Sequence, residues 1–149
     1  MGRRMRVLAT LTVAVLLLAS IPGMALAGSQ NGSLTSCHDD GFWKSHPEAW
    51  PVSTVTVGSV TYTKAEAIAI LKTRAKGDMT YVMWREVLCA QLNIAAVPNA
   101  PYLSPHAFDL PREFLANNPL GSGVTRSSTT WSNYSAAADL LHTFNNWRR

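Results

Sequence analysis

The residues best suited to chemistry lie together in the segment 37–51. His46 could act as a general base there, oriented by the carboxylates of Asp39 and Asp40, with Lys44 as an electrophile. That set would make the protein a hydrolase. The chain contains no G-x-S-x-G, H-E-x-x-H, phosphate-loop or dinucleotide motif that would identify a known catalytic class.

Packing is the competing interpretation of the same segment, which also holds Phe42, Trp43, Trp50 and two prolines. Tryptophan buries a large area but its indole N–H still needs a polar partner, so aromatic clusters recruit His and carboxylates for structural reasons. This interpretation is favoured. The aromatic residues then form a plug over a helix, and His46 and Lys44 satisfy backbone groups around it.

Aromatic side chains could also bind a ligand, because their flat faces stack on sugars and peptides. Trp131 and Tyr134 follow a Ser/Thr-rich stretch and are the aromatic residues most expected at the surface. The predicted binding residues are therefore Trp43, His46, Trp50, Trp131 and Tyr134.

A metal site is a third interpretation, built from the histidines together with Asp39 and Asp40. The histidines are scattered and show no ligand spacing, so we predict no metal site and no cofactor. The histidines concerned are His38, His46, His106 and His142.

Cys37 and Cys89 are the only cysteines, and an even count in an exported chain favours a disulfide. The bridge would close a loop of about 53 residues and contribute about 4 kcal/mol. Two alternatives stay open. Residues 34–37 are similar to the lipidation signal of bacterial lipoproteins, and Cys37 with His38 could ligate a metal.

The N-terminus predicts a secretory signal peptide over residues 1–27: three arginines, an apolar run, and an A-x-A site that ends at Ala27. Cleavage leaves 122 of the 149 residues, with ten basic and nine acidic side chains. That balance predicts no nucleic-acid binding. No second apolar run is long enough to span a membrane, so the mature chain is expected to be secreted.

The remaining chain is expected to have a flexible leader over 28–36 and a single globular domain over 37–149. A hairpin is predicted around the turn Gly58-Ser59, and Thr63-Lys64-Ala65-Glu66 is a capping box that opens a helix. Helices are expected over 64 to about 72–75, 79–95, 111–117 and 135–147. The predicted fold is mainly α (small α+β): three to four helices packed on the aromatic and proline-rich N-terminal segment, with one short hairpin and one disulfide.

The segment Gly41–Pro51 resembles the G-[FY]-W-K-x-H-P-x-x-W-P signature of a secreted bacterial domain family of unknown function. Further similarities lie at Tyr62-Thr63, at Gly77-Asp78, at 88–93 and at 144–146, whereas Cys89 departs from the pattern. The resemblance implies export and fold, and no activity. The predicted function is an extracellular or cell-surface binding or structural module with an unknown partner. The alternatives are an exported hydrolase centred on His46 and a metal-binding module.

Overall fold

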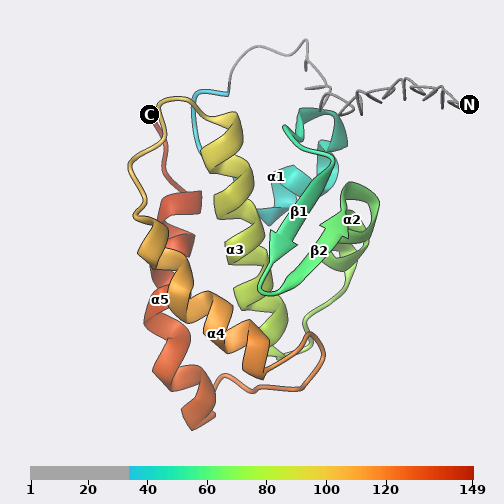
Figure 1. Ribbon diagram of the computed structural model, residues 1–149, viewed down its shortest axis with the longest axis vertical. Coiled ribbons are helices and arrows are strands. Elements are labelled where there is room, and N and C mark those ends of the chain that lie inside the picture. The colour runs from blue at the N-terminus through green and yellow to red at the C-terminus, as the bar shows by residue number, and fades with distance from the viewer. Residues whose placement is uncertain (1–33) are drawn as a thin grey trace, which may run out of the picture.

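The computed structural model describes residues 34–149; the predicted signal peptide, its cleavage after Ala27 and residues 28–33 of the predicted leader lie outside the described residues. As predicted, the described chain is mainly helical and contains one two-stranded antiparallel hairpin (Figure 1). In chain order the elements are α1 (Asp40–Ser45), a 3₁₀ turn (Pro47–Ala49), β1 (Thr54–Val57), β2 (Val60–Thr63), α2 (Lys64–Lys72), α3 (Met79–Ala96), a 3₁₀ turn (Pro105–Phe108), α4 (Asp109–Asn117) and α5 (Thr129–Asn145).

The first helix, α1, was not predicted. It forms because its first turn is capped by a side chain. The carboxylate of Asp39 accepts a hydrogen bond from the backbone N–H of Phe42 and so caps the first turn of α1. The helix ends at His46, because a residue before proline is disfavoured in helical geometry. Pro47 then opens the short 3₁₀ turn, since proline is well suited to a first helical position.

The hairpin and α2 follow the predicted local signals. Val57 pairs with Val60, so the two-residue turn is Gly58-Ser59. Only Gly58 of these two has a positive φ, as a type II′ turn requires. A β-carbon at Gly58 would also lie 3.1 Å from that of Leu115 on α4, so glycine is needed here twice over. The capping box between Thr63 and Glu66 is complete in both directions.

The long helix α3 forms the centre of the domain and contacts α1, β1, α4 and α5 (Figure 1). Helix α5 runs parallel to it, with both N-termini at the lower end of the view. Helix α5 begins six residues before the predicted Ser135, because the Ser128 hydroxyl accepts a hydrogen bond from the N–H of Trp131 and caps the helix earlier.

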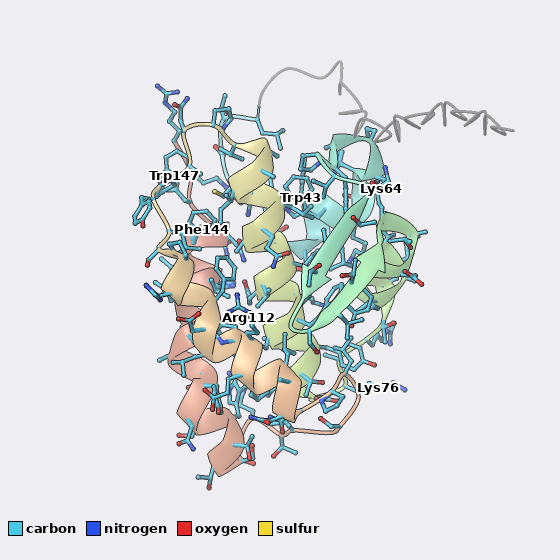
Figure 2. The ribbon with its side chains drawn as sticks, in the orientation of Figure 1. Trp43, Lys64, Lys76, Arg112, Phe144 and Trp147 are labelled. Atoms are coloured by element: carbon cyan, nitrogen blue, oxygen red, sulfur yellow. The ribbon has the colours of Figure 1, made fainter. Side chains whose placement is uncertain are left out.

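Two apolar clusters flank α3. The larger contains Trp43 and Trp50 with residues of the hairpin, α2 and α3; Figure 2 shows Trp43 between α3 and the hairpin. The Trp43 indole N–H donates to the carbonyl of His38, and that of Trp50 donates to the carbonyl of Trp43. The smaller cluster gathers the start of α3, α4 and α5 around Phe114 and Trp131. Burial with a satisfied indole N–H makes the first two tryptophans structural.

A buried polar network joins the N-terminal segment to α3 and α5. The Asn93 amide accepts from the His38 N–H at 2.8 Å and donates to the His38 carbonyl at 2.9 Å and to Asn145 Oδ1 at 3.0 Å. Asn145 in turn donates to the backbone carbonyl and to Oε2 of Glu86. Because Asn93 and Asn145 are almost fully buried, these bonds fix the relative register of the three segments.

Candidate functional site

The two predicted catalytic aspartates line a cavity of about 170 Å³ between α1, α3 and α5. Neither His46 nor Lys44 lines it. The cavity combines charged and polar groups from three segments far apart in the sequence. Its lining residues are Asp39, Asp40, Val82, Arg85, Glu86, Cys89 and His142.

His46 lies instead in a column of three stacked rings on the exposed side of α1. The Phe42 ring is stacked between His38, at a centroid distance of 3.7 Å, and His46, at 4.3 Å. Nδ1 of His46 lies 3.0 Å from the Ser45 hydroxyl and 3.1 Å from the Phe42 carbonyl. The ring is therefore held by its own helix and is not oriented by Asp39 or Asp40.

Helix α3 supplies the floor and one wall of the cavity. Val82, Arg85, Glu86 and Cys89 are spaced three and four residues apart, which places them on one face of the helix. A charged pair in the middle of an apolar helix was the available signal for this site. Of these four residues only Cys89 was predicted to have a role, in the disulfide, and neither Arg85 nor Glu86 was predicted as a site residue.

Arg85 is held between two segments but keeps one donor free. A terminal guanidinium nitrogen donates to the Thr73 carbonyl, while Nε lies 3.9 Å from Asp40 Oδ2. That separation is too long for a hydrogen bond. Over residues 34–149, Arg85 Nε is one of two buried side-chain nitrogen or oxygen atoms without a hydrogen-bond partner, the other being Trp84 Nε1.

Glu86 of α3 and His142 of α5 form an ordered pair across the cavity lining. Glu86 Oε1 lies 2.9 Å from His142 Nδ1, and Oε2 accepts from Asn145 at 2.8 Å. The Glu86 side chain is 17% exposed and that of His142 is 64% exposed. A carboxylate thus orients an imidazole that reaches solvent, as in a general base.

Cys89 lies at the floor and is only 2% exposed. Burial raises the pKa of its thiol well above the ordinary value, and the carboxylates of Glu86, Asp40 and Asp39 raise it further, against an opposing effect of Arg85. The thiol is therefore neutral at physiological pH and unsuited to nucleophilic attack.

The predicted disulfide between Cys37 and Cys89 is absent from the structure: both residues are buried free thiols. The backbone next to Cys37 is fixed elsewhere. The Cys37 N–H donates to the Trp147 carbonyl, and His38 is bound by Asn93, one helical turn beyond Cys89. One turn is a displacement of about 6 Å along α3, so the backbone next to Cys37 is held one turn away from Cys89.

The other predicted site residues are distributed over the molecule. Trp43, Trp50 and Trp131 are buried, so of the five predicted binding residues only His46 and Tyr134 are at the surface. The Tyr134 hydroxyl donates to Glu113 at 2.8 Å. His106 pairs with Asp109, away from the other histidines. The described part of the chain holds no group of three or more His, Cys, Asp or Glu side chains placed to bind a metal ion.

Comparison of the chain with protein-family models, with curated proteins and with solved structures finds no match. The resemblance of residues 41–51 to a secreted bacterial family therefore stays a prediction. Among the helices of residues 34–149, none combines the length and the apolar character needed to cross a bilayer.

Proposed function

We propose that this protein is an exported binding module that holds a cationic group of its ligand in the cavity between α1, α3 and α5. The charge of the cavity carries the proposal: three carboxylates, from Asp39, Asp40 and Glu86, face a single guanidinium, that of Arg85. A positively charged ligand group would relieve the repulsion among these carboxylates.

The carboxylates differ in how far they are already used by the protein. Both oxygens of Glu86 accept hydrogen bonds or pair with His142, and one oxygen of Asp39 caps α1. Asp40 accepts no hydrogen bond from the described residues, and its side chain is 40% exposed at the rim. Asp40 is thus the carboxylate most open to a ligand cation.

Binding is better supported than hydrolysis. His46 lies outside the cavity, and Cys89 inside it is a neutral thiol. The Glu86–His142 pair has the form of a base, but no activated nucleophile accompanies it in the cavity. A module that binds by charge needs only the geometry that these residues already have.

The test is a nuclear magnetic resonance titration of the purified full chain with n-butylamine and with neutral n-butanol at about pH 6. We expect saturable shifts at the amides of Asp40 and Arg85 with the amine alone. Asp40→Asn should weaken that binding about tenfold, since it removes one charge without changing shape. Asp139→Asn is the matched control, because Asp139 is an exposed carboxylate on α5 that does not line the cavity. Equal binding of amine and alcohol would refute the proposal.

Export is tested separately by the intact mass of protein recovered from the medium of expressing cells. A mass that starts at Gly28 and carries two free thiols is expected. A chain retained in the cell with residues 1–27 attached would contradict export and leave the charge of the cavity unaffected.

A further inference from the structure

We infer that a second surface, at the end of the molecule where α3 and α5 begin, binds a linear polymer that carries phosphate groups. Figure 1 shows the two loops that form this surface, one between α2 and α3 and one between α4 and α5, at the lower end of the view. We call it the basic end, after its cations Arg74, Lys76 and Arg126. None of them lines the cavity between α1, α3 and α5, so the inference goes beyond the proposed function and does not depend on it.

Two hollows at the basic end meet at one lysine side chain. The first measures about 490 Å³, lies between the two loops and is lined by Arg126. The second measures about 530 Å³, lies between the first loop and Tyr81 of α3, and is lined by Arg74. Lys76 lines both hollows, and Figure 2 shows its side chain pointing outward at this end of the molecule. Two ligand-sized hollows in a row suit an elongated ligand that lies across both.

The charge of the basic end is positive, and the protein itself does not use its cations. All three are exposed, and none forms an ion pair within residues 34–149. Asp78 is the one acidic residue that lines the hollows, which leaves a net charge of +2 from three cations and one carboxylate. Its oxygens already accept hydrogen bonds from Thr80 and from the N–H of Gly123. Neither α3 nor α5 has an acidic residue in its first turn, so both helix dipoles add to the positive potential.

The backbone at Lys76 indicates that this lysine is not present for the sake of the turn. The N–H of Asp78 donates to the carbonyl of Ala75 at 2.9 Å, and the two residues between them have positive φ, 49° at Lys76 and 87° at Gly77. These are features of a type I′ turn, in which Asn, Asp and Gly are the usual residues. Among the described residues, Lys76 is the one non-glycine residue with a positive φ. Because a lysine in this conformation costs stability, its charge is the property that a function would use.

The side chains of the basic end are those that contact phosphate in other proteins. Arginine and lysine bind phosphate oxygens through charge-assisted hydrogen bonds, and serine, threonine and tyrosine hydroxyls add further donors. The hydroxyls of Thr125 and Ser127 line the first hollow, and that of Tyr81 lines the second. A row of phosphate groups along one chain could therefore contact donors in both hollows at once.

A lipid surface fits the basic end less well. Stable attachment to a bilayer needs apolar insertion or a lipid anchor in addition to a few cations. The large apolar side chains that are exposed over residues 34–149 all lie outside the two hollows. They are Val52, Val60, Ile94, Tyr102, Leu110 and Leu140.

Nucleic acid also fits less well than a polymer without bases. Proteins that bind single strands stack the bases on aromatic side chains. The aromatic side chain that lines the hollows, that of Tyr81, is half-buried. The basic end thus offers contacts to phosphate groups and no open platform for bases.

The test is a nuclear magnetic resonance titration of the purified full chain with inorganic polyphosphate at about pH 7 and about 50 mM salt. We expect saturable shifts at the amides of Lys76 and Arg126. The logarithm of the affinity should fall with the logarithm of the salt concentration with a slope of about −2, since each of three phosphate contacts contributes about 0.7 for a single chain. Poly-glutamate, oligothymidylate and phosphatidylglycerol vesicles should each bind more weakly.

Each other result would overturn a stated part of the inference. Poly-glutamate that binds as tightly as polyphosphate would overturn the choice of phosphate. Tighter binding of the vesicles would replace the polymer by a lipid surface, and tighter binding of oligothymidylate would replace it by nucleic acid. Polyphosphate shifts that do not saturate, or that miss both loops, would overturn the site. None of these results bears on the binding of n-butylamine in the cavity, so the proposed function is tested separately.

Variants separate the charge of the basic end from its fold. Lys76→Asn removes the charge that both hollows share and places a residue that suits the turn. It should weaken polyphosphate binding about fivefold and make the salt slope shallower by about 0.7, without lowering the midpoint of urea denaturation. Arg126→Gln on the other loop should have a similar effect on binding. Arg149→Gln is the matched control, because Arg149 is exposed at the opposite end of the molecule (Figure 1), and affinity should stay within about twofold.

The same variants can overturn the assignment. If Arg149→Gln weakened binding as much as Arg126→Gln, the total charge of the protein would explain the attraction and the basic end would not be a site. If Lys76→Asn lowered the urea midpoint and left the polyphosphate affinity unchanged, the lysine would have a structural role only.

Discussion

The aromatic segment 42–50 and the polar face of α3 differ in how unusual their sequences are and in the role that their residues have in the structure. The segment draws attention through two tryptophans, a phenylalanine, a histidine and a proline within nine positions, yet its tryptophans are buried in the core. The face of α3 shows only Arg85, Glu86 and Cys89 inside an ordinary apolar helix, yet it lines a charged cavity. Unusual residues can thus mark packing, and ordinary ones can mark a site.

The physical reason is that the polar groups of the two regions differ in how completely they are hydrogen-bonded or paired inside the protein. The two tryptophan rings of the segment are buried and pack edge to face. Their indole N–H groups donate to backbone carbonyls, so no polar group of these rings is left unbonded. The charges on α3 cannot be satisfied by apolar neighbours. They recruit Asp40 from one side and His142 from the other, and some bonding capacity is left over.

Trp43→Ala gives the largest expected effect, because Trp43 is fully buried in the larger core. Removing the ring should lower the free energy of unfolding by about 3–5 kcal/mol, measured by urea denaturation. Tyr102→Ala is the control: Tyr102 is 86% exposed and its loss should change stability by less than about 0.5 kcal/mol. A stable Trp43→Ala protein would break the assignment of the segment to packing.

Asn145→Leu should have the next largest effect, about 2–4 kcal/mol of stability. The change removes the acceptor of one of the two hydrogen bonds that the buried Asn93 amide donates, and it removes both hydrogen bonds that Asn145 donates to Glu86. Asn133→Leu, at an exposed position of the same helix, should leave the free energy of unfolding nearly unchanged. If both substitutions have the same effect, the network does not hold the cavity wall in place.

These two cases also show which parts could be predicted. The hairpin, the capping box at Thr63 and the helix predicted over 79–95 depend on residues close in sequence, and these predictions are confirmed, the helix ending at Ala96. The cavity depends on contacts such as Glu86 with His142 and Arg85 with Asp40, which are 56 and 45 positions apart. No spacing rule reports such pairs. The missed helix α1 falls between, since Asp39 was visible in the sequence but was considered only as a candidate catalytic carboxylate and not as a helix cap.

Alkaline pH should lower the free energy of unfolding through ionisation of Cys89, by less than the two core substitutions above. Because folding raises the pKa of this thiol above its value in the unfolded chain, its contribution is complete below about pH 8.5 and is lost as pH rises through the folded pKa. The loss approaches about 1.4 kcal/mol per pH unit in that range. Between about pH 8 and 10.5, the free energy of unfolding from urea denaturation should therefore fall more steeply with pH for the unmodified protein than for Cys89→Ala.

Cys37→Ala sharpens this measurement. Burial raises the pKa of Cys37 as well, but Arg148 opposes the shift, whereas three carboxylates add to it at Cys89. Cys37→Ala should therefore flatten the alkaline limb less than Cys89→Ala. The reverse order would mean that the carboxylates do not act on the floor of the cavity.

His46→Ala is expected to have the smallest effect, and it tests the comparison most directly. The substitution removes an exposed ring that stacks on one face of Phe42, a contact worth about 0.5–1 kcal/mol. Because the ring lies outside the cavity, amine affinity should stay within about twofold, while Asp40→Asn lowers it about tenfold. The same titration read on both variants compares the two regions in one experiment. If His46→Ala weakened amine binding as much as Asp40→Asn, the aromatic segment would belong to the site, and its unusual residues would mark function as well as packing.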